Sequence, residues 1–212
     1  MDNKRNLIIC LLFIAFFSGK ASAQEDTLNA SHAANHSFYV PGAVLTITNR
    51  IEYTGTLTAL GMNVNLPRDW SYVSVSTGGT MIRVMDTGDL EIFWTSIPTS
   101  PVEFSYMVKT SEESISDQKI ESRILYYRSS ETERIAQVLP DYLIFEVAGD
   151  INNDGSVTLA DAVIALRVGA GTDTAGYVRG DYAVSGIDVS GDDKVGIEEA
   201  VYVLTRLVMQ KE

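Results

Sequence analysis

The sequence is poor in the side chains that most often carry catalysis. Its 212 residues include a single cysteine and two histidines, His32 and His36. One cysteine excludes a disulfide framework, a thiolate zinc site and an iron–sulfur cluster. Both histidines lie near the amino terminus, so the rest of the chain lacks the commonest general acid–base group. A pair of carboxylates can still cleave a glycoside, but no such pair stands out. We therefore predict that the protein is not an enzyme.

Positive charge is also scarce. The chain has 16 lysine and arginine residues against 28 aspartate and glutamate residues, which gives a formal net charge of −12. This balance argues against a nucleic-acid partner, because phosphates need a basic surface. It suits the binding of hard cations through oxygen ligands. Hydrophobic residues make up 45% of the chain, which is ordinary for a globular protein.

One long apolar run is present, at Leu7–Phe17. Lys4 and Arg5 precede it, and small residues up to Ala23 follow it. This is the anatomy of a secretory signal peptide over residues 1–23. As a helix the run would be only ~16 Å long, against ~30 Å of hydrocarbon in a bilayer. We expect a secreted or cell-surface protein, with the periplasm also allowed, and no membrane span after cleavage.

The next segments differ in their patterning. Residues 24–37 are small and polar, and we predict a disordered linker there. From residue 38 to 147, apolar and polar residues alternate in short stretches, as in Val102–Lys109 and Met62–Leu66. Glycine and proline turns separate these stretches. Period-two patterning with regular turns predicts an all-β antiparallel sandwich over 38–147.

After Val147 the apolar period becomes helical. Apolar residues spaced i, i+3, i+4 and i+7, or i, i+4, i+7 and i+11, are characteristic of one helix face, and each spacing occurs once. The two stripes are Leu159, Ala162, Val163 and Leu166, and then Ile197, Val201, Leu204 and Val208. We predict a small α-helical domain over 148–212, with Leu159 and Ile197 in its core. The segments repeat about 38 residues apart, counted from Asp150 to Asp188.

An acidic loop precedes the first of these helices. In a 12-residue loop around Ca²⁺, inward-facing oxygen ligands recur at alternate positions, glycine allows the turn at position 6, and a carboxylate closes the shell at position 12. Counted from Asp150, Gly155 falls at position 6. The candidate ligands are Asp150, Asn152, Asp154, Ser156 through its backbone carbonyl, Thr158 and Asp161. Val157, at position 8, is expected to pair its backbone with the matching residue of a second loop.

A second loop of this kind begins at Asp188. Its candidate ligands are Asp188, Ser190, Asp192, Lys194 through its backbone carbonyl, and Glu199. Two departures predict weaker binding: Asp193 stands where glycine is preferred, and Gly196 leaves position 9 to water. The alternative interpretation is two acidic turns that cap helices. Two such loops in tandem, each followed at once by a helical stripe, favour calcium. Magnesium prefers octahedral, water-rich sites with fewer protein ligands.

Residues 149–208 resemble a type I dockerin, in which each of two EF-hand-like calcium loops is followed by a helix and none is preceded by one. The resemblance implies binding to a cohesin-like protein in an extracellular or cell-surface assembly. Dockerin partner contacts use loop positions 10 and 11, commonly serine or threonine. Here those positions hold Leu159 and Ala160, then Ile197 and Glu198. This departure does not affect the calcium prediction.

Through the stretches Tyr39–Thr48 and Leu60–Trp70, the sandwich segment resembles cohesin-like or immunoglobulin-like modules of secreted bacterial proteins. Together the two segments suggest a secreted, calcium-binding, non-catalytic module for protein–protein attachment. Arg167 and Arg206, one in each helix, are candidate partner contacts. The alternative is a carbohydrate-binding or adhesion module, in which Trp70, Tyr72 and Trp94 stack on a polysaccharide and calcium only stabilises the fold.

Overall fold

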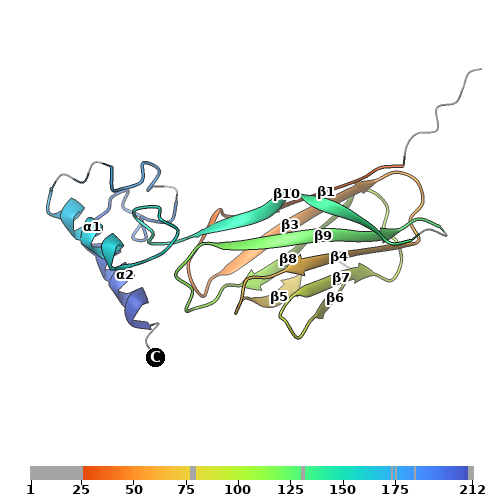
Figure 1. Ribbon diagram of the computed structural model, residues 1–212, viewed down its shortest axis with the longest axis horizontal. Coiled ribbons are helices and arrows are strands. Elements are labelled where there is room, and N and C mark those ends of the chain that lie inside the picture. Colours follow the sequence, from red (N-terminus) through yellow and green to blue (C-terminus); the bar gives the residue numbers. More distant parts are fainter. Residues whose placement is uncertain are drawn as a thin grey trace, which may run out of the picture.

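The computed structural model describes residues 26–76, 80–129, 132–172, 174, 176–183 and 185–209. The predicted signal peptide, residues 1–23, lies outside the described residues. The molecule is elongated, with a β-sandwich forming most of its length and two helices at one end (Figure 1). Among the described residues, no helix combines the length and apolarity needed to cross a membrane.

In the part of the chain that the structure describes, ten strands form the sandwich. Their hydrogen-bonded order divides into a layer β5-β8-β3-β1 and a layer β10-β9-β4-β7-β6, joined where β1 meets β10. Neighbours pair antiparallel, except that β10 pairs parallel with β1 and β2. The prediction of a β-sandwich is confirmed, whereas the two parallel pairings of β10 depart from the predicted antiparallel arrangement. The strands are β1 Leu28–Ala34, β2 Phe38–Tyr39, β3 Val44–Tyr53, β4 Ala59–Asn65, β5 Ser71–Val75, β6 Thr80–Val84, β7 Leu90–Trp94, β8 Val102–Lys109, β9 Gln118–Tyr127 and β10 Arg134–Val147.

The alternation in the sequence becomes the two faces of each strand. In β8, the apolar residues Val102, Phe104, Tyr106 and Val108 are buried, while the residues between them are exposed or half-buried. The same rule holds in β3 and β4. Side chains from both layers meet in one core, whose fully buried members include Ile47, Met62, Ile124 and Phe145. Burial of one face therefore fixes the register of each strand.

The prediction of a disordered linker over 24–37 is wrong, because β1 occupies much of it. β1 pairs antiparallel with β3 from Leu28↔Tyr53 to Ala34↔Ile47. Only Ala30 and His32 of β1 are buried, so the apolar pattern was too weak to reveal a strand. The Nε2 atom of His32 lies 2.7 Å from the Pro140 carbonyl oxygen on β10. This contact helps to hold β1 between the two layers.

Two helices follow the sandwich, α1 Leu159–Gly169 and α2 Ile197–Met209. Thr158 caps α1 in a capping box with Asp161, which satisfies N–H groups that a helix start leaves free. The carboxyl end of α1 lies against the start of α2, since a Cβ atom on Gly169 would sit 3.5 Å from the Gly196 Cα. The two helices therefore approach each other where α1 ends and α2 begins.

The prediction of which helix faces are buried is wrong for every stripe residue except Ala162, which is 1% exposed. Leu159 and Ile197, expected in the core, are 61% and 63% exposed. The residues that face inward are Ala162, Ile164 and Ala165 on α1 and Ala200 and Val203 on α2. Three of these five are alanines, whose small side chains let the helices approach closely. The larger apolar stripe faces outward.

Candidate calcium loops and their junction with the sandwich

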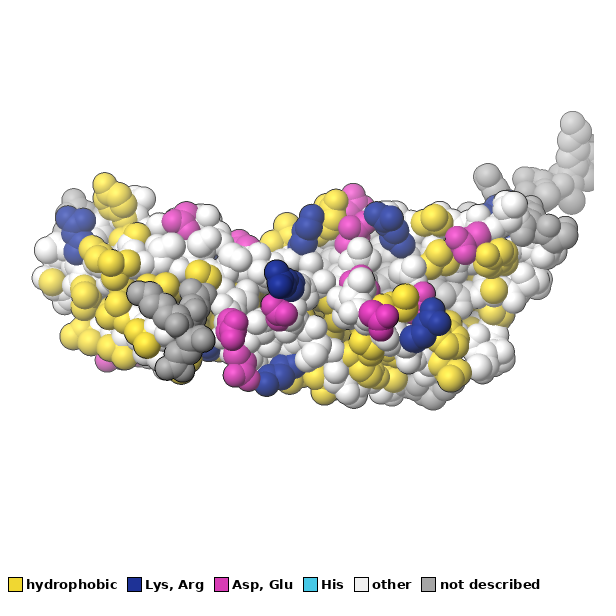
Figure 2. Space-filling model, turned by 60° about the horizontal axis from the view of Figure 1, so that its bottom comes forward, with side chains coloured by type: hydrophobic (Ala, Val, Ile, Leu, Met, Phe, Trp, Pro, Cys, Tyr) yellow, Lys and Arg dark blue, Asp and Glu magenta, His cyan; other side chains and the backbone are white. Residues whose placement is uncertain are grey.

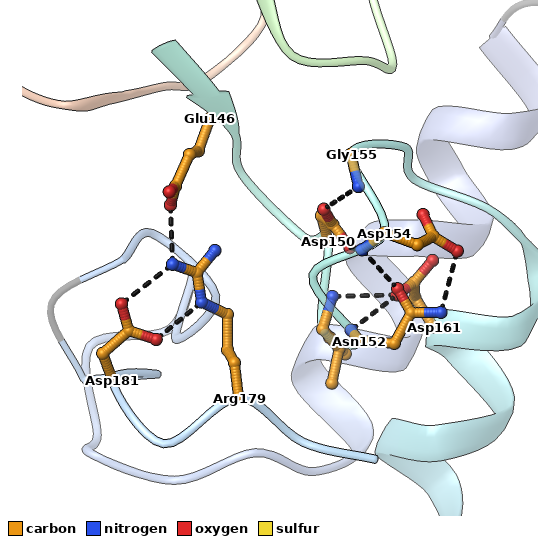
Figure 3. A network of polar contacts seen from close by, with 9 residues as sticks. Glu146, Asp150, Asn152, Asp154, Gly155, Asp161, Arg179 and Asp181 are labelled. Carbon is orange, nitrogen blue, oxygen red and sulfur yellow. Dashed lines mark hydrogen bonds and ion pairs between the residues drawn. The ribbon is translucent and has the colours of Figure 1, made fainter. Parts of the chain in front are cut away.

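The first predicted loop wraps around its two end carboxylates. The Asp150 side chain accepts hydrogen bonds from the backbone N–H groups of Asp154, at 3.1 Å, and Gly155, at 2.8 Å. Asp161 accepts from the N–H of Ile151 at 2.8 Å and from that of Thr158 at 2.8 Å. Both aspartates are buried, and Figure 3 shows them converging within the loop. The structure thus brings positions 1 and 12 together.

The middle ligands of the first loop also turn toward its backbone. Asn152 Oδ1 accepts from the Asp154 N–H at 3.0 Å, and Asp154 Oδ1 accepts from the Ser156 N–H at 3.1 Å. Gly155 has φ +86°, a left-handed conformation that glycine adopts without steric cost. The chain can therefore turn sharply at position 6, as the spacing predicts.

Negative charge is concentrated in this loop. Burial raises the pKa of Asp150 above its usual value, and the nearby carboxylates of Asp161 and Asp154 act in the same direction. Hydrogen bonds from the N–H groups of Gly155 and Asp154 oppose this rise. A cation among these oxygens would relieve the mutual repulsion.

The second loop is built similarly but is more open. Asp188 accepts from the N–H groups of Gly191, Asp192 and Asp193, at 2.7, 3.1 and 2.6 Å. Desolvation works to raise the pKa of Asp188, but these N–H donors outweigh it and the pKa is lowered. Asp193 adopts φ +60° at the turn position, so it accepts the left-handed conformation for which glycine is preferred.

The closing carboxylate of the second loop has an unused oxygen. Glu199 is 1% exposed, and its Oε2 accepts from the Gly196 N–H at 2.7 Å. Its Oε1 is buried without a hydrogen-bond partner among the described residues. Leaving a charged oxygen unpaired in the interior costs free energy. A cation bound at this position would satisfy it.

The donor set suits calcium. The described residues contain no group of three or more His, Cys, Asp or Glu side chains drawn together as a metal cluster. Calcium, however, also accepts amide, hydroxyl and backbone carbonyl oxygens, and both loops supply these. With the buried, unpaired Glu199 Oε1 in the second loop, the residues present fit Ca²⁺.

The first loop pairs with the sandwich, which the sequence did not reveal. The Val157 N–H donates to the Ile115 carbonyl at 2.7 Å, and the Asp117 N–H donates to the Gly155 carbonyl at 3.1 Å. Ser116 and Ser156 form an antiparallel bridge. The prediction that Val157 pairs with the second loop is therefore wrong for its N–H group. No local pattern could identify Ile115 as its partner, because the two are far apart in the sequence.

Two arginines tie the helical part to the sandwich. Arg179, between α1 and the second loop, bonds Glu146 at the end of β10 at 2.7 Å and Asp181 at 2.6 Å (Figure 3). Hydrogen bonding to Asp181, together with Glu146, raises the pKa of Arg179. Arg206 on α2 donates to the Pro41 carbonyl at 3.0 Å and the Glu112 carbonyl at 3.3 Å.

Arg206 therefore belongs to the internal junction. The prediction that it contacts a partner protein, as the counterpart of Arg167, is wrong. Arg167 itself is exposed. The apolar core also crosses the junction, since Val157, Ala162 and Val203 belong to the same buried cluster as the sandwich interior. The sandwich and the helices are therefore packed against each other through both polar and apolar contacts.

Large apolar side chains cover the outer surface of the helix pair. Figure 2 shows hydrophobic side chains gathered at the end of the molecule that carries the helices. Seven of them form the two outward stripes and are 40–69% exposed. We call this set the helix patch: Leu159, Val163 and Leu166 on α1, and Ile197, Val201, Leu204 and Val208 on α2.

The aromatic platform predicted for sugar stacking does not form. Trp70 is 4% exposed and packs against Tyr39 and Phe145, with ring centroids 5.3 and 5.5 Å away. Trp94 packs edge-on against Phe104. These rings anchor the sandwich core, which is the commoner role of large aromatics.

Comparison with known proteins shows only weak similarity to solved structures. No protein-family model and no curated protein matches the chain. Among solved structures, the major pilin SpaD of Corynebacterium diphtheriae aligns with a TM-score of 0.45 and 12% identity, over 55% of this chain and 34% of the pilin. The chain thus spans about a third of that pilin.

Two cohesins align at a similar level. A non-cellulosomal cohesin of Archaeoglobus fulgidus has a TM-score of 0.40 and 11% identity, over 57% of this chain and 91% of the cohesin. A type II cohesin of Acetivibrio cellulolyticus has a TM-score of 0.41 and 8% identity, over 56% of this chain and 95% of that domain. The resemblance of the second segment to dockerins stays a prediction.

Proposed function

We propose that the chain is a secreted, non-catalytic attachment module that binds calcium and docks a partner protein through the helix patch. The observation that supports docking is the patch itself. On monomeric soluble proteins, a large exposed apolar patch usually marks an interaction site. The inward helix faces are already filled by alanines together with Ile164 and Val203, so the outward stripes are not needed for the core.

Calcium would act by fixing the starts of both helices. The first loop would hold the ion through Asp150, Asn152, Asp154, the Ser156 carbonyl, Thr158 and Asp161, and the second through Asp188, Ser190, Asp192, the Lys194 carbonyl and Glu199. Asp161 and Glu199 each lie in the first turn of a helix. Binding at these residues would set the position of α1 and α2, and with them the geometry of the helix patch.

The test uses the full chain, immobilised, with proteins secreted by its host. A cognate partner should bind in millimolar calcium and be released by EDTA. It should fail to bind Val201→Glu, which puts a charge in the patch, yet bind Val73→Glu, which makes the same change on β5 of the sandwich, where Val73 is 47% exposed. Calorimetric titration with Ca²⁺ alone should give a similar affinity for both variants. Capture that ignores EDTA, or that is equal on both variants, would contradict the proposal.

A hollow on the sandwich supports the alternative of carbohydrate binding. It has a volume of about 630 Å³, and its lining includes Ser31, Thr48, Ser76 and Ser105 beside the ion pair of Arg50 with Glu103. Hydroxyl and charged groups can hydrogen-bond sugar hydroxyls. Retention on polysaccharide that survives EDTA and is lost in Arg50→Ala would favour this function over docking.

A further inference from the structure

A second apolar surface lies on the sandwich, on the outer face of the layer β10-β9-β4-β7-β6. Strand register places one residue from each of five neighbouring strands in a single row: Met81↔Phe93, Phe93↔Gly61, Gly61↔Leu125 and Leu125↔Ile135. Met81, Phe93 and Ile135 are 48%, 38% and 64% exposed. We call this row the sheet patch. Gly61 at its centre leaves the row flat.

The surroundings of the sheet patch resemble an interface rim. On one side the register continues with Ala59 and Tyr127, both exposed. On the other side lies a polar row that includes Arg83, Glu91 and Arg123, with Arg83 paired to Glu91. An apolar centre beside a polar row is the usual composition of a protein–protein contact.

The two patches have matching dimensions. The α2 stripe from Ile197 to Val208 rises ~16 Å along the helix. Five strands at the usual spacing are ~19 Å across. Two packed helices are also ~20 Å wide, given an interaxial distance of 8–10 Å. The helix patch can therefore cover the length of the sheet patch.

The two patches cannot meet within one molecule. The Asp117 N–H bonds to the first calcium loop just before β9 begins. Leu125 lies eight residues further along this strand, ~26 Å from that junction. Figure 1 shows the helices at one end of the sandwich, with β9 running away from them. Neither patch is covered by other described residues, as their exposure shows.

We propose that the occupant of the helix patch is the sheet patch of a second copy, so that copies associate head to tail. This inference rests on the proposed function, because it assigns a partner to the same docking surface. A two-fold contact between helix patches would leave both sheet patches in water, whereas a head-to-tail contact covers one patch of each kind. Because the two surfaces differ, the contact is heterologous and can continue into a filament or close into a ring.

The charge of the chain gives this association a characteristic salt dependence. Each copy carries a formal net charge of −12, so two copies repel each other at long range. Salt screens this repulsion over about 10 Å at 0.1 M. The contact itself is apolar. Association should therefore strengthen as sodium chloride is raised from 20 to 300 mM, whereas a contact made by ion pairs would weaken.

Sedimentation velocity of the full chain in calcium tests the proposal. Unmodified protein should form species larger than a dimer as concentration rises. Val201→Glu removes the helix patch and Phe93→Glu the sheet patch, and each alone should weaken self-association by at least about tenfold. An equimolar mixture should form a one-to-one dimer, because one variant keeps the helix patch and the other the sheet patch. Val73→Glu, on β5 of the other layer, should behave like the unmodified protein.

Three results would overturn the proposal. The first is an unmodified chain that stays monomeric at about 100 µM in calcium at every salt concentration. The second is a Phe93→Glu variant that still self-associates, which would indicate a two-fold contact between helix patches. The third is a mixture that forms no dimer. Circular dichroism shows whether each variant is folded, and Leu166→Glu and Ile135→Lys replace any that is not. Calcium-dependent capture of a different protein by a monomeric chain would retain the proposed function while excluding self-association.

Discussion

The Val157 N–H donates to the Ile115 carbonyl at 2.7 Å, so the first candidate loop pairs with a segment of the sandwich. The bridge between Ser116 and Ser156 extends this pairing. Val157, at position 8 of the loop, is thus held by the sandwich, to which our proposal assigns no calcium ligand. If the loop binds calcium as we propose, metal binding would be linked to folding of the adjacent sandwich edge.

Removal of calcium should lower the melting temperature of the whole chain. An ion that binds only the folded state stabilises it by about 2.7 kcal/mol when present at one hundred times its dissociation constant. Because the core is continuous across the junction, we expect one calorimetric transition that moves to lower temperature in EDTA. The sandwich should melt with the helices. An unchanged melting temperature, or a transition of the helical part alone, would contradict the linkage.

The two closing carboxylates should differ in importance. Asp161 accepts four hydrogen bonds, from the N–H groups of Ile151, Asn152 and Thr158 and from the Thr158 hydroxyl. Glu199 accepts one, from the Gly196 N–H. Asp161→Ala should therefore reduce total calcium affinity more than Glu199→Ala, since it also disorganises the loop. Calorimetric titration compares the two, and a larger loss in the glutamate variant would reverse the ranking.

Much of the fold could be predicted from local pattern, but the direction of the helix faces could not. Period-two stretches located the strands because each buries one face. In α1, apolar residues lie on both sides: Leu159 and Val163 outward, Ala162 and Ile164 inward. A periodic stripe identifies an apolar face without saying which neighbour it meets. The inward side consists largely of alanines, whose small side chains let the two helices pack closely.

The candidate loops were located by spacing, whereas their junction with the sandwich depends on distant residues. Asp150 and Asp161 are eleven positions apart, and a single turn brings them together. Ile115 and Glu146 are brought to the helical part by the tertiary fold of the sandwich, not by local spacing. The sequence did not predict β1 for a related reason. β1 is held by its pairing with β3, and only Ala30 and His32 of its residues are buried.

Arg179 should contribute to the attachment of the helical part. Its side chain is 9% exposed and reaches Glu146 on β10 as well as Asp181. Both carboxylates are partly exposed, so the loss on Arg179→Ala should be about 1–3 kcal/mol, below that of a fully buried pair. Chemical denaturation measures it. Asp181→Asn keeps the contact with Glu146 and should cost less. Equal effects of the two variants would show that the contact with β10 contributes nothing.

His32 should make stability depend on pH. Burial lowers its pKa, and the hydrogen bond with the Pro140 carbonyl opposes that shift only in part. A carbonyl can only accept, so Nε2 carries the proton of the neutral ring, and Nδ1 is buried without a partner among the described residues. The folded state therefore disfavours the second proton, which the unfolded chain takes up near pH 6.5. The contribution of His32 to stability is complete above that pH and is lost as pH falls toward the lowered pKa of the folded state.

The free energy of unfolding, measured by denaturation between pH 8 and 5, should fall by more in the unmodified chain than in His32→Gln. His36→Gln, in the same segment, is the control and should follow the unmodified chain. Identical curves for the unmodified chain and His32→Gln would show that this histidine does not couple folding to protonation.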